Sequence, residues 1–458
     1  MSVLAPLRHA SFRFLLAGRT INSLGNAIAP VALAFAVLDL TGSPSDLGLV
    51  VGARMLANVL FLLFGGALAD RMPKHHLMVG SSIAAAVTQG VVAALVLSGT
   101  ATIPLLIALA AVNGIAGALA LPASSSILPQ LIPAEIRQQA IALSRLSFNG
   151  ASIVGAPLGG VIVASVGPGW GIGVDAVTFM LSAVAFALLR LPAATGPTAS
   201  AASAPSSGPT ARAASTPSSG PTASAAPAAS SARTASAAPE RSSFISDLRA
   251  GWSEFRSRTW LWVVVTAFAV INAALSGGMS VLGPVVADDT VGRRAWGLVL
   301  AAQTVGMVLG ALVAMRVTVS RLLFFGVCCV AFEVFPMLAL GVAPHLGLLL
   351  AAAFLAGLGI VQFSVAWETT MQEHVPADKL ARVYSYDMVG SFVAIPVGQV
   401  AAGPIAQAVG VEPTLVGAAA LIGLAVAGML ASRDVRNVRH RPPTSRQAAG
   451  AAMEESTA

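Results

Sequence analysis

Charged and amide side chains stand at regular spacing within long apolar runs of this sequence. Arg19, Asn22 and Asn26 occur at positions i, i+3 and i+7, so they share one face if their run is a helix. Arg54 and Asn58 lie one helical turn apart in the next run. A charge at the centre of a bilayer costs about 2.5–3.5 kcal/mol, so charges that are kept there are candidates for function. These five residues are therefore candidates for a polar binding cavity, with hydrogen bonds between helices or an outward-reaching Arg54 as the alternatives.

Four acidic residues are candidates for taking up and releasing a proton. Asp175 and Glu333 stand among apolar residues, and a protonatable carboxyl group within the membrane is what proton coupling requires. Glu368 stands one turn before Gln372 near the end of its run, where a solvated rim position is the alternative. Asp387 opens a later run, where a carboxylate would also complement the positive end of a helix dipole.

Helices that span a membrane must position these side chains. Of the 458 residues, 56% are hydrophobic and only 10% are charged, whereas a soluble domain has about 25% charged residues. The apolar runs approach the roughly 20 residues that a helix needs to cross a bilayer, and they lack the alternation of barrel strands. The sequence therefore predicts an all-α membrane protein with 12 transmembrane helices. The predicted spans are 12–38, 47–69, 77–98, 104–125, 143–165, 170–190, 260–286, 296–316, 322–342, 346–370, 384–408 and 414–432.

Basic residues mark alternate loops between these spans. The loops on one side of the membrane, such as 39–46 and 409–413, contain no Lys or Arg, and only Arg293 and Arg294 depart from this pattern. Because basic loops stay in the cytoplasm and the number of spans is even, we expect both termini to be cytoplasmic. The expected location is a bacterial inner membrane, crossed many times. The same loops account for the net charge of +7 without nucleic acid as a partner.

A segment rich in Ala, Ser, Pro and Thr separates two apolar halves. It repeats Gly-Pro-Thr-Ala, and such sequence cannot bury enough apolar surface to offset its ordering entropy. The segment that follows it, from Phe244, has apolar residues at helical spacing and predicts an amphipathic helix on the membrane surface. The predicted divisions are an N-terminal six-helix bundle at 1–191, a disordered cytoplasmic linker at 192–241, a C-terminal half with interfacial helix and six-helix bundle at 242–432, and a cytoplasmic tail at 433–458.

The order of features in the first half repeats in the second. The segment Leu-Gly-Leu-Val-Val-Gly-Ala-Arg54 aligns with Trp-Gly-Leu-Val-Leu-Ala-Ala-Gln303, which puts Gly48 on Gly297. Internal repeats are typical of secondary transporters, in which one half rocks against the other around a site near the middle of the membrane.

A short motif closes the second span: Gly66, Asp70, Arg71 and Lys74. It resembles the cytoplasmic motif of the major facilitator superfamily, although Pro73 stands where that family usually has Gly. The resemblance implies two pseudo-symmetric six-helix bundles. It also implies a gate in which Asp70 sits at the positive N-terminus of a facing helix, a contact worth about 0.3–1 kcal/mol when exposed. The alternative is that these charges only cap helices and fix topology.

A second motif lies in the fifth span: Gly155, Pro157, Gly159 and Gly160. It resembles the Gly/Pro motif of the drug-antiporter members of the family, except that Ala156 stands where they have Gly directly before Pro. Glycines allow helices to approach closely and Pro bends them, so ordinary close packing is the alternative.

Residues 12–70 and 367–387 resemble the branch of the family that contains enterobactin and macrolide exporters. Many members of that branch carry Asp where Asn26 stands. In the family's fold the first and tenth helices line the cavity. The sixth and ninth helices, which would carry Asp175 and Glu333, are peripheral.

Together these features predict a secondary active transporter. We expect proton-coupled efflux of a small apolar or amphiphilic organic compound, such as a drug, macrolide or siderophore-like metabolite, by alternating access. An antiporter of this kind would confer drug resistance. The expected partners are the small-molecule substrate, protons and the lipid bilayer, and the chain is expected to act as a monomer. The few charges in the spans disfavour a sugar phosphate or a dicarboxylate, which would demand more Arg or Lys in the cavity.

Other kinds of chemistry lack their motifs. The sequence has no Gly-x-x-x-x-Gly-Lys-Ser/Thr loop for ATP, and His75 and His76 have no further ligands at metal spacing. No nucleophile–base arrangement stands out, so neither an enzyme nor a cofactor is expected. Two alternatives stay open: an importer of a small organic solute with the same fold, and a non-transporting membrane scaffold or sensor, which would need a folded soluble domain.

Overall fold

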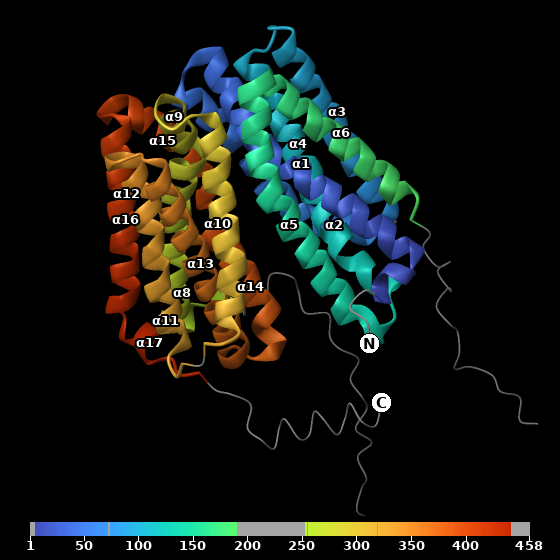
Figure 1. Cartoon of the computed structure of the whole chain (residues 1–458). Helices are drawn as coiled ribbons and strands as arrows, with labels where there is room; N and C mark the ends of the chain where they lie inside the picture. Colours follow the sequence, from blue (N-terminus) through green and yellow to red (C-terminus); the bar gives the residue numbers. More distant parts are fainter. Residues whose placement is uncertain (1–4, 72–73, 190–251, 254, 318, 441–458) are drawn as a thin grey trace, which may run out of the picture.

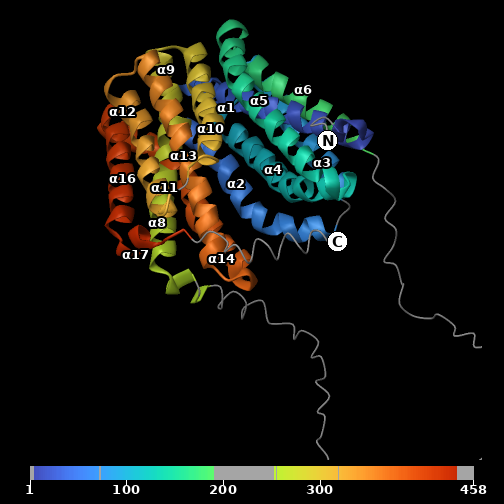
Figure 2. The same cartoon turned by 60° about the horizontal axis from the view of Figure 1, so that its bottom comes forward.

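The computed structural model describes residues 5–71, 74–189, 252–253, 255–317 and 319–440. Within these ranges it leaves out the side chains of 63–71, 74, 121–126, 129–130, 134–135, 377–378 and 381. Over the described residues the regular structure is helical, and 12 spans are long and apolar enough to cross a membrane. The predicted fold class is therefore confirmed, with two bundles of helices side by side (Figure 1, Figure 2). The predicted linker, most of the predicted interfacial helix and the tail from 441 lie outside the described residues.

The N-terminal half holds one helix for each of its six predicted spans. After a short 3-10 turn at Ala5–Arg8, these are α1 (Ala10–Thr41), α2 (Pro44–Arg71), α3 (Lys74–Leu97), α4 (Ile103–Leu131), α5 (Ala134–Val166) and α6 (Pro168–Ala187). Most of their ends extend beyond the predicted apolar runs, whereas α3 and α6 end slightly before the predicted ends at 98 and 190. The difference is largest for α5, which begins at Ala134 rather than near residue 143, because its first turns are helical but polar.

The C-terminal half is built from more pieces. Its helical segments are α8 (Thr259–Leu275), η2 (Ser276–Leu282), α9 (Gly283–Asp289), α10 (Arg293–Ala314), α11 (Leu322–Val330), η3 (Ala331–Glu333), α12 (Val334–Val342), α13 (Leu346–His374), α14 (Ala377–Phe392), α15 (Ala394–Val409), α16 (Val411–Ala431) and α17 (Arg433–Asn437). The seventh, ninth and eleventh spans are each divided, whereas the eighth, tenth and twelfth are continuous.

A proline stands just after each of these divisions. Proline has no backbone N–H and its ring collides with the carbonyl group four residues earlier, so it disturbs the regular hydrogen-bond ladder, although α1 and α5 continue past Pro30 and Pro157. Pro284 follows the π-helical turn η2, Pro336 follows the 3-10 turn η3, and Pro396 follows the break between α14 and α15. The eleventh span also begins earlier than predicted. Asp387 therefore lies inside α14 and does not open a helix.

The two halves touch through glycines that the sequence repeat relates. A Cβ atom at Gly48 on α2 would collide with the carbonyl oxygen of Gln399 on α15, and one at Gly297 on α10 would collide with that of Ala156 on α5. These contacts form two equivalent pairs of helices from opposite halves. They confirm that Gly48 corresponds to Gly297, and they lie at the end of the bundle away from the chain termini (Figure 1). We call this the closed end. At the other end, the open end, the halves diverge.

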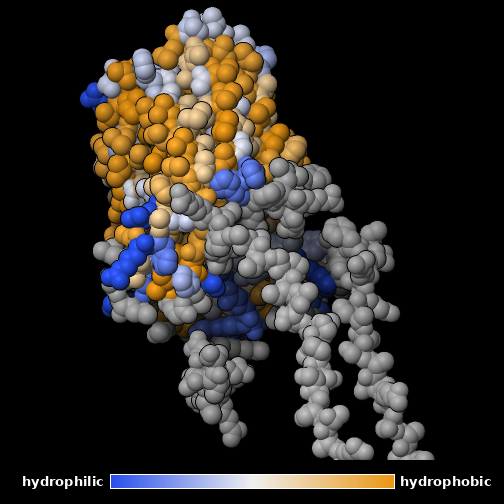
Figure 3. All heavy atoms as spheres, turned by 90° about the vertical axis from the view of Figure 1, so that its right-hand side faces the viewer, coloured by the Kyte–Doolittle hydropathy of each residue, from blue (hydrophilic) through white to orange (hydrophobic). Residues whose placement is uncertain are grey.

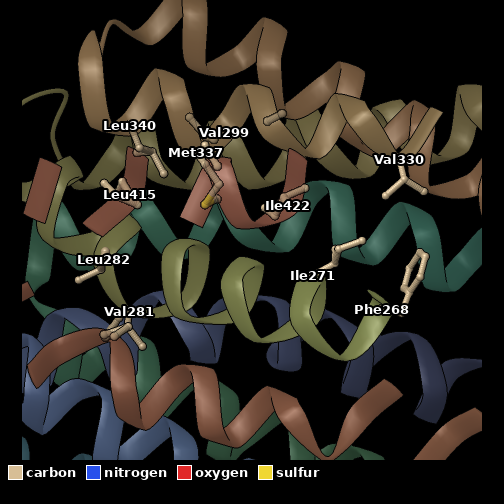
Figure 4. Packing of buried hydrophobic residues seen from close by; sticks show 14 of the residues in the cluster. Phe268, Ile271, Val281, Leu282, Val299, Val330, Met337, Leu340, Leu415 and Ile422 are labelled. Atoms are coloured by element: carbon tan, nitrogen blue, oxygen red, sulfur yellow. The ribbon is translucent and has the colours of Figure 1, made fainter. Parts of the chain in front are cut away.

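Apolar side chains cover the outside of the bundle as well as its interior. Figure 3 shows a broad hydrophobic face on the side formed by the N-terminal half, where Val87 and Val177 are both more than half exposed. In water such a face would be unfavourable, and in a bilayer it contacts lipid tails. Inside the C-terminal half, residues such as Ile271, Met337 and Leu415 interlock between α8, α12 and α16 (Figure 4).

Close helix approach within each half also depends on glycine. A Cβ atom at Gly306 on α10 would collide with the carbonyl oxygen of Phe354 on α13, whereas a Cβ atom at Gly423 on α16 would meet nothing within 4 Å. We predict that Gly306→Ala lowers the free energy of unfolding by about 1–3 kcal/mol, as overpacking does.

Thermal unfolding of the detergent-solubilised protein checks this prediction. Gly423→Ala is the matched control and should leave the midpoint unchanged or slightly higher, because Ala is the better helix former. Equal midpoints for the two variants would contradict the packing argument.

Candidate functional site

A cavity of about 910 Å³ lies within the N-terminal half. Every described residue that lines it comes from α1 to α6, and none comes from the C-terminal half. Its volume suits a drug-sized molecule, for which binding pockets measure roughly 300–1,000 Å³. The five candidates that the sequence placed on the first two helices all line this cavity: Arg19, Asn22, Asn26, Arg54 and Asn58.

The first two helices join in a small hydrogen-bond network on the cavity wall. The amide of Asn26 donates to the backbone oxygen of Asn22 at 3.0 Å and to its side-chain oxygen at 2.5 Å. The Asn26 side-chain oxygen in turn accepts a hydrogen bond from Arg54 at 3.4 Å. The helical spacing of Asn22 and Asn26 therefore links Asn22 to Arg54 through Asn26. The predicted cavity role and the alternative of helix–helix hydrogen bonding apply to the same residues.

Arg54 is fixed on the wall by the packing of its own helix. A Cβ atom at Gly114 on α4 would collide with the backbone oxygen of Arg54, and Asn58 donates to the backbone oxygen of Gly114 at 3.1 Å. The second half repeats this contact, since a Cβ atom at Gly357 on α13 would collide with the backbone oxygen of Gln303. The repeat has thus kept the backbone contact while the side chain differs, arginine in one half and glutamine in the other.

The fifth helix contributes residues that the sequence analysis missed. Arg137, Ser144, Arg145 and Asn149 line the cavity from α5. They are spaced four, seven or eight residues apart, which places them on one helical face. This spacing is the feature of the sequence that could have identified them as cavity residues. The predicted span, which began at 143, contained Ser144, Arg145 and Asn149 but left Arg137 in a loop, because the first turns of α5 are polar.

Asp175 lies directly behind the cavity wall. Its carboxylate is fully buried on α6, accepts a hydrogen bond from Gln89 on α3 at 2.6 Å, and lies within electrostatic range of Arg54. The hydroxyl group of Thr178 donates to the backbone oxygen of Asp175 at 2.7 Å. A Cβ atom at Gly25 would collide with both Asp175 and Thr178, so the first helix passes directly over this group. The carboxyl group is close to the cavity and closed off from it.

The other acidic candidates lie in the C-terminal half, apart from the cavity. Glu333 is buried in the 3-10 turn of the ninth span. Glu368 is exposed near the open end of α13, as a rim residue would be. Asp387 is half-buried, and accepts hydrogen bonds from the indole of Trp367 at 3.0 Å and from Ser391 at 3.2 Å. The structure does not bring these three residues to the network around Arg54.

The structure describes the side chains of only one of the two sequence motifs. For Gly66, Asp70, Arg71 and Lys74, the backbone shows α2 ending at Arg71 and α3 beginning at Lys74, and their side chains lie outside the described residues. The gate role stays a prediction.

The glycines of the second motif are packing positions. A Cβ atom at Gly155 would stand 2.6 Å from the Ala27 side chain on α1, and one at Gly160 would stand 2.8 Å from the backbone oxygen of Arg293 on α10. Gly159 likewise faces α1, and Pro157 lies within α5 between them.

Arg293, which departs from the charge pattern of the loops, joins the two halves at the closed end. Its guanidinium binds Asp39 of α1 at 2.5 and 3.0 Å and Asp288 of α9 at 2.7 and 3.0 Å. Its Cζ atom also lies 4.9 Å from the centre of the Phe35 ring. The alignment that puts Gly48 on Gly297 also puts Asp39 on Asp288, so one arginine holds two repeat-related carboxylates.

The fold and the cavity define a multi-pass membrane transporter with two related halves. The family model of the Major Facilitator Superfamily matches residues 15–398, and the chain belongs to that superfamily. Its members carry small molecules across membranes.

Two relatives are similar in sequence. The chain is 25% identical to the multidrug efflux pump Tap of Mycolicibacterium fortuitum over 402 residues, which cover 85% of this chain and 88% of Tap. It is 32% identical to the uncharacterized MFS-type transporter YfiS of Bacillus subtilis (strain 168) over 171 residues, which cover 37% of this chain and 40% of YfiS.

Solved structures share the fold at low sequence identity. A bacterial homologue of the human lysosomal transporter Spinster, in an inward-facing and unoccupied conformation, has a TM-score of 0.66 at 16% identity, covering 96% of this chain and 99% of that chain. The nucleoside transporter NupG has a TM-score of 0.67 at 12% identity, covering 92% of this chain and 98% of that chain.

We predict that Arg293→Gln loosens the closed end, because Asp39 and Asp288 would then face each other without a cation. Exposed ion pairs contribute about 0.2–1 kcal/mol, so we expect a roughly two- to fivefold shift away from the present conformation. Spin labels at Leu40→Cys and Asp289→Cys report the separation of the halves.

The labels are introduced after Cys328→Ser and Cys329→Ser replace the two native cysteines. Arg294→Gln is the control, since it removes a neighbouring exposed arginine. A distance distribution for Arg293→Gln that matches this control would show that the ion pairs do not hold the closed end.

Proposed function

We propose that this chain is a proton-coupled exporter of a small amphiphilic organic compound. The observation that carries the proposal is the cavity, which combines polar groups such as Arg54 and Asn26 with apolar side chains such as Phe179 and Phe186. A molecule with one polar end and an apolar body fits such a wall. The similarity to the efflux pump Tap over 85% of this chain supports the direction.

Alternating access gives this cavity its role. The halves meet at the closed end and diverge at the open end (Figure 1), and in our proposal the substrate reaches the cavity from the open end in this conformation. The basic loops support an orientation with the open end in the cytoplasm of a bacterial cell and both termini on that side. A substrate would then enter from the cytoplasm and leave after the halves rock, when Arg293 releases Asp39.

Asp175 is the proton carrier that we propose. It is fully buried, while Gln89 holds its carboxylate at 2.6 Å and the cavity lies in front of it. Uptake of a proton would remove a charge that acts on Arg54, and so couple the charge state of Asp175 to binding in the cavity. Glu333 is the second candidate for this role, although it lies in the other half.

We predict that cells expressing the chain accumulate less of a labelled macrolide than efflux-deficient parent cells, and that a protonophore abolishes the difference. Asp175→Asn should also abolish it, because the amide has nearly the same shape but cannot take up a proton. Asp434→Asn, at an exposed position on α17, should export like the unmodified chain.

Asp175→Glu tests whether a carboxyl group is what matters, since it should restore part of the export. Protonophore-insensitive export by the unmodified chain would contradict proton coupling. Higher macrolide accumulation than in the parent cells would indicate an importer.

We predict that Asp70→Asn slows export roughly two- to fivefold, the effect of losing a contact with a helix N-terminus that is worth about 0.3–1 kcal/mol. Initial rates of macrolide efflux from preloaded cells measure this, with Asp434→Asn as the control. An unchanged rate for Asp70→Asn at equal expression would favour the alternative that the motif only caps helices and fixes topology.

A further inference from the structure

The polar groups on the cavity wall are hydrogen-bond donors in excess. Four arginines line it, namely Arg19, Arg54, Arg137 and Arg145, and no Asp or Glu is among the described lining residues. Arginine carries five N–H donors and no acceptor, and it stays charged. These arginines bring positive charge to the described part of the wall, within a membrane protein whose low dielectric strengthens the field of each charge.

Arg54 is the arginine best placed to bind a ligand. Its side chain is half-buried on the wall, and the close contact between its backbone and Gly114 fixes the helix that bears it. Among the described residues its hydrogen-bond partner is Asn26, at 3.4 Å, which occupies one of the two Nη groups. The remaining donors suit the two oxygens of a carboxylate or a similar anion, which arginine binds with two parallel hydrogen bonds.

The nearest carboxylate does not neutralise the wall. Asp175 has no exposed surface, and it is enclosed by Gln89, Thr178 and the first helix at Gly25. It offsets part of the charge of Arg54 from behind, but it cannot reach a molecule in the cavity. A cationic ligand would find no acidic partner on the described wall.

Besides its arginines and neutral polar residues, the lining has an apolar and aromatic part. Phe148, Phe179 and Phe186 line the same cavity, with Met78 and Leu128. A small hydrophilic anion would leave these surfaces without a partner. An anion with an apolar body would bury them and place its charged group against the arginines.

We infer that the cavity selects amphiphilic organic anions, with the anionic group bound at Arg54 and Asn26 and the apolar body against the phenylalanines. This inference rests on the proposed function, because it assumes that the cavity is the substrate site. It narrows the substrate from amphiphilic compounds in general to those bearing a carboxylate or comparable anionic group. It also revises the expectation that the spans hold too few arginines for an anion, since Arg137 and Arg145 add to those on the first two helices.

Two dyes built on the same xanthene ring system test the inference: fluorescein, an anion at neutral pH, and rhodamine 123, a cation. Fluorescence anisotropy measures their binding to the purified full-length protein in nanodiscs. Fluorescein should bind more tightly, and Arg54→Gln should weaken its binding by about tenfold or more, as the loss of a charged hydrogen bond does. Arg54→Lys should retain part of the affinity, and Arg294→Gln, at the exposed closed end, should retain all of it.

Tighter binding of rhodamine 123, binding of neither dye, or unchanged fluorescein affinity in Arg54→Gln would overturn the inference. Equilibrium binding does not depend on the direction of transport or on the coupling ion. A failure of cells expressing the chain to export fluorescein, with preserved fluorescein binding to the purified protein, would therefore count against the proposed export and in favour of the anion site. Macrolide export together with a preference for the cationic dye would support the proposed export and count against the anion site.

Discussion

The backbone-to-backbone contacts between opposite halves are the constraint on which the other features of this protein depend. At Gly48 and Gly297 the absence of a side chain lets α2 approach α15 and α10 approach α5 until main-chain atoms touch. In lipid, helices gain little from the hydrophobic effect when they associate, so such van der Waals packing is a main source of affinity between them. The contacts are local to one end of the bundle. The helices can therefore diverge at the other end without separating the halves.

The repeat has kept this backbone frame and changed the side chains on it. Gly114 packs on the backbone of Arg54 as Gly357 packs on that of Gln303. In the N-terminal half the wall around Arg54 is polar and encloses a cavity. In the C-terminal half the rings of Phe268 and Phe363 stack at 4.1 Å, and further aromatic residues extend the packing. Among the described residues the cavity thus lies in the N-terminal half, whereas stacked aromatic rings pack within the C-terminal half.

Two charged residues at the closed end also occupy positions that the repeat relates. Asp39 and Asp288 are related by the repeat, yet one residue, Arg293, binds both. Two carboxylates facing each other would repel, and the arginine converts that repulsion into a link between α1, α9 and α10. Because the three side chains are partly exposed, the link is modest in energy. A modest link suits a protein whose halves must part at this end in every transport cycle.

The sequence by itself determined the number and apolar character of the spans, the repeat and the polar residues of the first two helices. Apolar length and helical spacing are local properties, so they can be read without a structure. Pro336 and Pro396 also indicate possible helix breaks in the sequence. The positions of these breaks became clear only from the backbone hydrogen bonds of the structure.

Only the tertiary structure decided which polar residues meet. It placed Asp175 behind Arg54 and left Glu333 and Asp387 elsewhere, and it brought Arg145 of α5 into the cavity. It also gave Arg293 partners that lie 254 residues and five residues away along the chain. Periodicity fixes the face of one helix on which a residue lies. Which helix that face meets is set by the glycine contacts, and these arise from packing between segments that are distant in sequence.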